Sequence, residues 1–348
     1  MSEGEIGNMS NEVKLLAEPY TSNRKLPSNF QKKDERVFEN ELSKEIPRAA
    51  IVELKDSLFV AEGLVFVKRK IHPDTLRYKP VRGQLEFRVW LKAKLSYKKV
   101  EMADKAIVLH NYYWNGYFHW MTEVLPKLLA VKELEDDVCL VLPELRAAYQ
   151  RTTFEAFEFE NFTFLKERTY IKPKNLLSVE NFAPAGNFNN EYICRLADFL
   201  KSRFAIPLDR KEERKIYISR KKALKRKVLN EAELETALKG LGYEILCMED
   251  YTFAEQIAIC SQSKVMVALH GAGLTNMMFM PKSSVVYELR FEHDFHNNCY
   301  FTLSSEFNHD YYYQLCSAEQ EGQETHAGNV IINQAEFHQN LQMIEQSL

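Results

Sequence analysis

The sequence predicts an α/β protein with two doubly wound lobes whose parallel sheets face a cleft. Apolar segments of strand length alternate with segments of helical length in two tandem series, one before and one after residue 209. A strand, a helix and a second strand in succession are typical of parallel pairing. A length of 348 residues is sufficient for two such domains.

The first 45 residues are polar and weakly patterned, and we expect them to form an arm or a loosely packed cap. Apolar and polar side chains then alternate in places between residues 50 and 100, which is typical of short strands. The strands expected there are Leu58–Val60, Gly63–Val67 and Leu85–Trp90. They give the N-terminal lobe, residues 46–208, a β-containing extension.

The alternation of strands and helices in this first lobe begins after residue 105. Its expected strands are residues 106–109, 138–142 and 162–165, and its expected helices are residues 117–134, 144–157 and 190–204. The regular spacing predicts a parallel sheet with helices packed against it.

A very polar stretch, Asp209–Lys215, is the expected linker to the C-terminal lobe, residues 209–348. The expected strands of that lobe are residues 216–219, 243–246, 264–269 and 285–289, and its expected helices are residues 231–241 and 253–261. The second alternation therefore predicts a second parallel sheet.

Composition and charge exclude several classes of protein. Lys and Arg number 46 against 49 Asp and Glu, a net charge of −3, which argues against a nucleic-acid binder. The six cysteines are widely spaced and several lie in apolar runs, so we expect free thiols in a reducing compartment. No apolar stretch reaches the roughly 18 residues of a membrane span, and the polar N-terminus is unlike a signal peptide. We therefore expect a cytoplasmic protein, with peripheral contact at the inner face of a membrane left open.

A glycine loop follows the apolar strand 264–269. Two glycines let the backbone approach a ligand closely, and the free N–H groups at the start of a following helix attract an anion. A dinucleotide-binding fingerprint needs a small residue where Asn276 stands, and the chain has no Gly-x-Ser-x-Gly elbow. The loop therefore predicts a phosphate or diphosphate site, with a purely structural turn as the alternative. Its candidate ligand-binding residues are His270, Gly271, Ala272, Gly273, Leu274 and Asn276.

A basic segment, Arg214–Lys227, contains no acidic residue. It spans the strand 216–219 and the loop after it, and the carboxyl ends of parallel strands are where ligands bind. We expect Arg220 and Arg226 to neutralise a diphosphate, because guanidinium groups bind phosphate oxygens in a bidentate manner. A solvated charged face is the alternative.

An aromatic segment, residues 112–120, follows the strand 106–109. Aromatic rings outside a core are typical of a platform for sugar rings, and the candidate acceptor-binding residues are Tyr113, Trp114, Asn115 and Tyr117. His119 and Glu123 are four residues apart and so share a helix face. A histidine near neutral pKa suits general base catalysis; a buried histidine in a core helix is the alternative.

Metal chemistry has little support in the sequence. No Asp-x-Asp and no His-x-x-x-His occurs in the chain. If the substrate is a nucleotide sugar, arginines and backbone amides must then stabilise the leaving diphosphate in place of a divalent cation. We expect neither a metal nor another cofactor.

Taken together, these segments resemble the family 61 glycosyltransferases. The resemblance covers roughly residues 105–290, and Lys127 stands where the family often has Arg. The residues that carry it are Gly116–Lys127, Tyr217–Arg220, Arg226, Asn230–Glu231, Gln256, His270–Asn276, Phe279, Pro281 and Glu288–Leu289.

The resemblance implies a GT-B-like pair of lobes and inverting, metal-independent transfer from a nucleotide sugar, with a UDP-sugar favoured, to a glycan or glycolipid acceptor. It looks most like the soluble bacterial members that act in capsule or lipopolysaccharide assembly. His119 is then the expected base, with Glu123 orienting or replacing it, and Glu288 is expected to bond ribose hydroxyls. A non-catalytic scaffold that binds nucleotide sugars or glycans is the alternative, and the sequence does not specify the oligomeric state.

Overall fold

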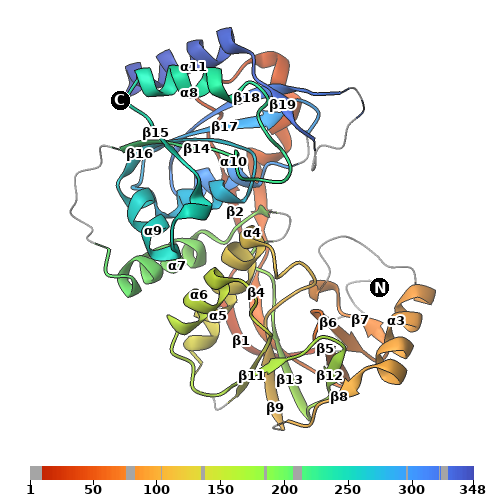
Figure 1. Cartoon of the computed structure of the whole chain (residues 1–348). Coiled ribbons are helices and arrows are strands. Elements are labelled where there is room, and N and C mark those ends of the chain that lie inside the picture. The colour runs from red at the N-terminus through yellow and green to blue at the C-terminus, as the bar shows by residue number, and fades with distance from the viewer. Residues whose placement is uncertain are drawn as a thin grey trace. The chain divides into compact units, whose positions relative to one another are not determined.

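The computed structural model describes residues 10–75, 83–102, 104–134, 138–183, 186–206, 214–294, 297–320, 322 and 328–348 (Figure 1). The chain forms two compact units. The first unit comprises the described parts of Met1–Tyr20 and Glu45–Ala185, and the second those of Thr21–Lys44 and Gly186–Leu348. Both are mixed α/β structures with parallel strands, which confirms the predicted α/β class. The GT-B arrangement of two lobes about a cleft stays a prediction.

The larger sheet of the first unit has six strands in the order β1-β4-β13-β9-β10-β11. The last four strands of this order run parallel, and the other two pair antiparallel at one edge. The strands are β1 (Ser10–Ala17), β4 (Ala49–Leu54), β13 (Asn175–Val179), β9 (Lys105–Val108), β10 (Cys139–Pro143) and β11 (Phe162–Leu165). Each of the three strands predicted after residue 105 is present.

The smaller sheet of the first unit has the order β7-β6-β5-β12-β8. A shared core of buried side chains, among them Phe59, Val108, Val141 and Ile171, packs the two sheets together. The strands are β7 (Lys70–Ile71), β6 (Leu64–Val67), β5 (Ser57–Val60), β12 (Thr169–Ile171) and β8 (Lys98–Lys99).

The predicted strand at Leu85–Trp90 is wrong, because this segment lies in the helix α3 (Gly83–Ser96). Val89, Trp90 and Ala93 recur at helical spacing and pack with Phe66 of the smaller sheet. Over six residues, the alternation of apolar and polar side chains is that of a strand, and the helical period is visible only over a longer stretch.

The sheet of the second unit has the order β15-β14-β16-β17-β18-β19, and its first five strands are parallel. In chain order these five read 2-1-3-4-5, a doubly wound arrangement whose switch point lies between β14 and β16. The strands are β15 (Glu244–Leu246), β14 (Arg214–Ile218), β16 (Ser263–Leu269), β17 (Val285–Phe291), β18 (Asp310–Ala318) and β19 (Val330–Ile331).

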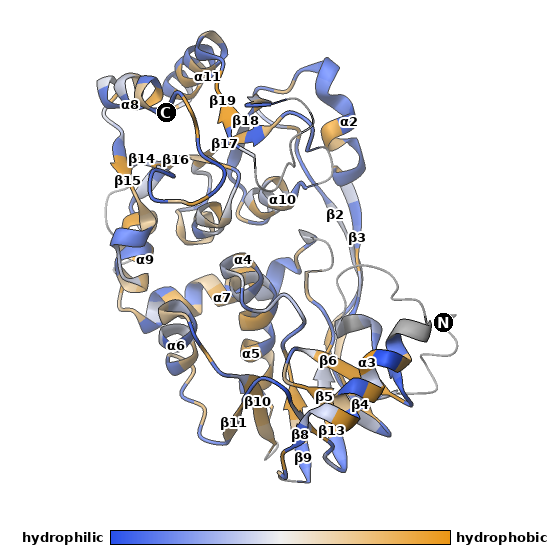
Figure 2. Ribbon diagram, turned by 45° about the vertical axis from the view of Figure 1, so that its right-hand side comes forward, coloured by the Kyte–Doolittle hydropathy of each residue, from blue (hydrophilic) through white to orange (hydrophobic). Residues whose placement is uncertain are grey.

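Helices cover both faces of this sheet (Figure 1). One face carries α8 (Glu231–Gly240) and α11 (Gln334–Ser347), whose apolar turns bury Leu234 and Phe337 against Tyr217 and Tyr287. Both helices contain blue and orange residues in Figure 2, as expected for amphipathic helices. The other face carries α9 (Phe253–Ser261), α10 (Cys299–Glu306), α7 (Asn190–Arg203) and the 3₁₀ helix η7 (Ala272–Phe279).

The compact units divide the chain at other positions than the predicted boundaries at 45/46 and 208/209. The longer segment of the second unit begins at Gly186 because α7 packs against η7 and α10. Of the predicted linker Asp209–Lys215, residues 209–213 lie outside the described residues, and Arg214 and Lys215 begin β14.

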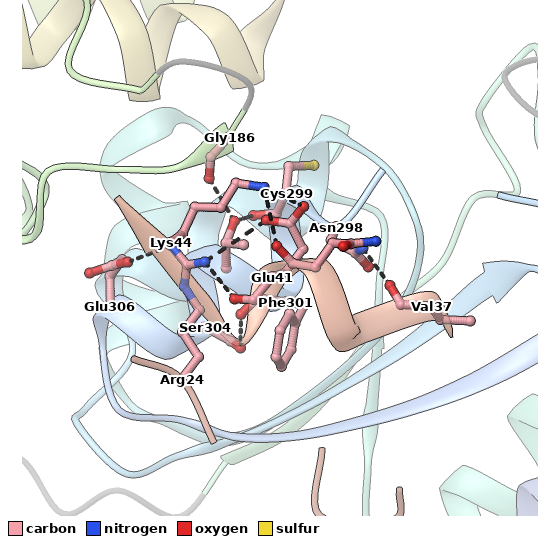
Figure 3. A network of polar contacts seen from close by, with 12 residues as sticks. Arg24, Val37, Glu41, Lys44, Gly186, Asn298, Cys299, Phe301, Ser304 and Glu306 are labelled. Atoms are coloured by element: carbon pink, nitrogen blue, oxygen red, sulfur yellow. Dashed lines mark hydrogen bonds and ion pairs between the residues drawn. The ribbon is translucent and has the colours of Figure 1, made fainter. Parts of the chain in front are cut away.

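Residues 10–44 also differ from the predicted loose arm. Residues 10–17 form β1, and residues 21–44 belong to the second unit. There the ring of Phe38 is fully buried, with its centroid 4.8 Å from that of Tyr313. Figure 3 shows polar contacts of the same segment, in which Arg24 forms an ion pair with Glu306 and Asn298 donates to the carbonyl of Val37.

All six cysteines are free thiols, and four of them are buried. Burial raises the pKa of the Cys260 thiol to about 12. The thiolate is the reactive form of cysteine, so this residue is a packed apolar group and not a nucleophile.

Candidate active site

The switch point of the second unit brings together two of the predicted segments. Arg220 follows β14, and the glycine loop follows β16, the neighbouring strand. A Cβ atom on Gly271 would lie 2.6 Å from Nη1 of Arg220, and one on Gly273 would lie 3.2 Å from Cγ2 of Ile218. The glycine loop thus lies close to Arg220 and to the end of β14, and a side chain at either glycine would require Arg220 or Ile218 to shift.

Arg220 and Arg226 place two positive charges beside the glycine loop. Arg220 donates from Nε to the carbonyl of Arg226 (2.7 Å) and from Nη2 to that of Lys225 (3.0 Å). Burial, and then the charge of Arg226, lower the pKa of Arg220. Neither arginine forms an ion pair with a carboxylate of the described chain. Two such guanidinium groups at a switch point suit an anion.

Most of the glycine loop lies in the 3₁₀ helix η7, which begins with a hydrogen bond from Leu274 N to Gly271 O (2.9 Å). The side chains of Leu274 and Asn276 are buried. Asn276 donates from Nδ2 to Oε1 of Gln256 in α9 (3.0 Å). The side chains of these two predicted residues are therefore packed inside the unit, and the Leu274 amide already donates within η7.

His270 is held at both ring nitrogens. Its Nδ1 contacts the carboxylate of Glu288, and its Nε2 lies 2.9 Å from Nδ2 of Asn297. Because the Glu288 carboxylate can only accept, Nδ1 of His270 carries a proton. The two partners fix the orientation of the ring.

Glu288 is fully buried, and its other oxygen accepts from the hydroxyl of Tyr311. Burial alone would raise the pKa of Glu288, but the charge and hydrogen bond of His270, with the charge of Arg290, hold it below its ordinary value. Both carboxylate oxygens have protein partners, so the geometry makes Glu288 an orienting group for His270. This differs from the predicted contact with ribose hydroxyls.

A second Glu–His pair lies in the first unit, after β9. Nδ1 of His119 is 2.7 Å from Oε1 of Glu123, and Nδ2 of Asn111 donates to Oε2 of Glu123 (2.6 Å). Glu123 is buried, whereas His119 is half-buried. The structure thus brings the two predicted catalytic residues together, and it adds Asn111, which was not among the predicted site residues. Its place in the loop shortly after a strand was the available signal.

The helix that carries this pair is interrupted. The sequence predicts one helix over Tyr117–Leu134, but the structure has α4 (Tyr117–His119), a π-helical turn (Trp120–Val124) and α5 (Leu125–Lys132). Leu125 N–H bonds to Trp120 O, five residues back. Pro126 follows at once and cannot donate, which favours a widened turn at this point. Such π turns are frequent at functional sites, and this one holds Glu123.

The aromatic segment lines a hollow of about 340 Å³ at the carboxyl edge of the larger sheet. Three of the predicted acceptor-binding residues, Tyr113, Trp114 and Asn115, are among its lining residues. Tyr117 instead contacts the ring of Tyr149, with centroids 4.9 Å apart.

Among the residues that the structure describes, no group of three or more His, Cys, Asp or Glu is arranged to hold a metal ion. Over the same residues, no helix has the length and apolar character needed to cross a membrane.

Residues 117–287 match the family described as Glycosyltransferase 61. The match contains His119, Glu123, both loop arginines and the glycine loop, and it stops one residue before Glu288. This part of the chain is therefore a glycosyltransferase 61 domain.

Several curated animal proteins are similar to parts of the chain. The EGF domain-specific O-linked N-acetylglucosamine transferase of Gallus gallus is 38% identical over 84 residues, which are 23% of this chain and 15% of the relative. Its Drosophila melanogaster counterpart is 32% identical over 124 residues, 34% and 23% of the two chains. The Protein O-linked-mannose beta-1,4-N-acetylglucosaminyltransferase 2 of Xenopus laevis is 30% identical over 100 residues, which are 28% of this chain and 17% of the relative. The matched segments thus span less than a quarter of these relatives. The family and the relatives agree on one class, an enzyme that transfers a sugar.

Proposed function

We propose that the chain is an inverting, metal-independent glycosyltransferase that moves a sugar from a nucleotide diphosphate sugar to a glycan or glycolipid acceptor. The observation that carries this proposal is the meeting of Arg220, Arg226 and the glycine loop at the switch point, inside the matched domain. Two guanidinium groups and loop amides suit the developing charge of a leaving diphosphate without a cation.

The donor we favour is a UDP-sugar. The relatives' names specify N-acetylglucosamine transfer, so UDP-N-acetylglucosamine is the first donor to test. Arg220 and Arg226 would bind the diphosphate, and His270, fixed by Glu288, would hold the loop in shape.

The base we propose is His119, oriented by Glu123. In a single displacement, a nitrogen of the His119 ring takes the proton of the acceptor hydroxyl as the hydroxyl oxygen bonds to the anomeric carbon. The bond from that carbon to the diphosphate oxygen breaks, and the electron pair leaves with the diphosphate. The anomeric configuration is inverted.

The biological setting also belongs to this proposal. A role of a soluble, bacterial-type enzyme in capsule or lipopolysaccharide assembly at the cytoplasmic face of a membrane follows from the sequence resemblance alone. The named relatives act on O-linked sites of proteins, so glycan and glycopeptide acceptors should be tested side by side.

The test is a transfer assay with UDP-N-acetylglucosamine and other UDP-sugars, in EDTA, with UDP release and product configuration measured by NMR. We expect EDTA-resistant transfer with inversion. Donor binding without transfer or donor hydrolysis would instead favour the non-catalytic scaffold, and a requirement for a divalent cation would contradict the metal-free mechanism.

A further inference from the structure

The hollow in the first unit is built from four loops. Three of them follow the parallel strands β9, β10 and β11, and the fourth is the turn after β5. Its volume of about 340 Å³ is at the lower end of the roughly 300–1,000 Å³ of small-molecule sites. The lining residues are Ala61–Glu62, Tyr112–Asn115, Pro143–Glu144, Arg146, Leu165 and Glu167.

Gly63 fixes one wall of the hollow. Its φ of +92° is in the left-handed region, and a Cβ there would lie 2.5 Å from the carbonyl carbon of Asn111. Only glycine allows this approach. It holds the neighbouring Glu62 beside the residues that follow Asn111.

Aromatic rings form a second wall. Tyr112 is 56% exposed, and its ring is nearly perpendicular to that of Tyr113, at 88° with centroids 5.4 Å apart. Trp114 is half-buried in the same wall. Exposed rings set at an angle offer apolar faces to a ring-shaped ligand with polar edges, such as a sugar.

Carboxylates dominate the charge of the lining. Glu62, Glu144 and Glu167 stand against the single cation Arg146, which pairs with Glu167 at 2.9 Å. The Glu62 carboxylate already accepts from the backbone N–H of Arg168 (3.1 Å) and acts on a ligand through its charge, whereas the exposed Glu144 can accept from the hydroxyl groups of a sugar. A uronate, sialate or phosphate would instead be repelled.

The hollow adjoins the candidate base. Tyr113 lines it, and the centroid of the Tyr113 ring is 5.6 Å from that of His119. A saccharide in the hollow would therefore lie next to the Glu–His pair of the first unit.

We propose that this hollow binds the uncharged saccharide end of the acceptor and that Glu62 and Glu144 select against anionic sugars. The inference rests on the proposed function, which it deepens by naming the acceptor class and two specificity residues.

The experiment uses pairs of methyl glycosides and methyl glycosiduronates with the same ring configuration (gluco, galacto and manno). Saturation-transfer NMR and competition titrations measure their binding to the full chain, and thermal unfolding with UDP is followed separately. We expect at least one neutral glycoside to bind and its uronate to bind at least tenfold more weakly. Glu144→Gln should reduce this discrimination severalfold, and Trp114→Ala should abolish binding. Glu155→Gln, an exposed carboxylate of the same unit outside the hollow, should change neither.

The outcomes separate this inference from the proposed function. If UDP stabilises the protein but no neutral glycoside binds, or if the uronate binds as tightly as its neutral partner, the inference is overturned and the transferase proposal stands. If a glycoside binds but UDP has no effect, the hollow is a saccharide site and the transferase proposal fails.

Discussion

The Glu–His pairs of the two units share one local plan and differ in their surroundings. In each pair, Nδ1 of the histidine contacts a glutamate whose second oxygen accepts another hydrogen bond, from Asn111 in the first unit and from Tyr311 in the second. The side chain of Glu123 keeps 7% exposure, whereas that of Glu288 has none. The partner of Glu123, His119, lies next to Tyr113, which lines a hollow.

This difference in burial indicates that the two Glu–His pairs have different roles. In the second unit, Asn297 occupies the remaining nitrogen of His270, and the main-chain carbonyl of His270 accepts from Arg226 (3.4 Å). That pair fixes the shape of a loop. The first pair, beside a hollow that can admit a ligand, is the better placed for proton transfer.

The largest effect should come from removing the histidine of the first pair. We expect His119→Ala to lower turnover by about 10²–10⁴-fold, the usual contribution of a general base, with UDP affinity unchanged. His270→Ala should act mainly on UDP affinity. Steady-state kinetics and UDP titrations check both, with His338→Ala as an exposed control. Near-normal turnover of His119→Ala would exclude His119 as the base and contradict the roles assigned to the two pairs.

The second comparison concerns stability. Glu288→Gln should lower the free energy of unfolding by about 3–5 kcal/mol, because it removes the buried negative charge that pairs with His270 and that, with Asp294, balances the buried Arg290. Glu123→Gln should cost less, since its site is less buried. The pKa of Glu288 is lowered in the folded state, so its contribution is present above its ordinary pKa of 4.5 and is lost as the pH falls through the folded value. Chemical denaturation at pH 7 and pH 4 measures this pH dependence. Equal losses of stability for Glu288→Gln and Glu123→Gln at pH 7 would refute the proposed difference between the two pairs.

The third comparison tests whether Arg220 belongs to the anion site. Arg220→Gln should weaken UDP binding about tenfold to hundredfold, the magnitude of a charged hydrogen bond of about 1.5–3 kcal/mol. Lys222→Gln is the matched control, because it removes a charge from the same loop that already pairs with Asp250. Calorimetric titration with UDP compares them, and equal affinities of the two variants would exclude Arg220 from the phosphate site.

The last comparison concerns two other buried histidines, one in each unit. Burial lowers the pKa of His110 to about 3 and that of His309 to about 4. The unfolded chain binds these protons below about pH 6.5 and the folded chain does not, so stability falls with falling pH by up to about 1.4 kcal/mol per unit for each histidine. His110→Asn and His309→Asn should each flatten this slope in denaturation curves between pH 6.5 and 4.5, and an unchanged slope in both would contradict the burial argument.

The alternating units of the fold could be predicted from the sequence because each buried strand is a short apolar run with a helix after it. The strands around residues 106–109 and 264–269 were found in this way and occur as β9 and β16. The helix α3 was misread because six residues are too few to distinguish its period from that of a strand. Residues 21–44 were read as loose because their anchors, such as Phe38, are single apolar residues in a polar segment.

The candidate site was predicted where local sequence defines it. His119 and Glu123 lie four residues apart on one helical segment, so their spacing alone predicted their contact. Glu62 and Glu144 could not be predicted as neighbours of Trp114, since separate loops bring them to one hollow. The burial of Glu288 likewise depends on Tyr311 and Arg290, which are defined by the packing of β17 and β18.

The most direct test of the account is thermal unfolding of the full chain with UDP and with UDP-N-acetylglucosamine, in the presence of EDTA and in its absence. A ligand at about 100 times its Kd adds roughly 2.7 kcal/mol to the stability of the folded state. We expect a clear upward shift of Tm that is the same with and without EDTA. The variant Arg220→Gln should show a smaller shift. No shift with either compound, or a shift that EDTA abolishes, would contradict a metal-free nucleotide diphosphate site at the glycine loop.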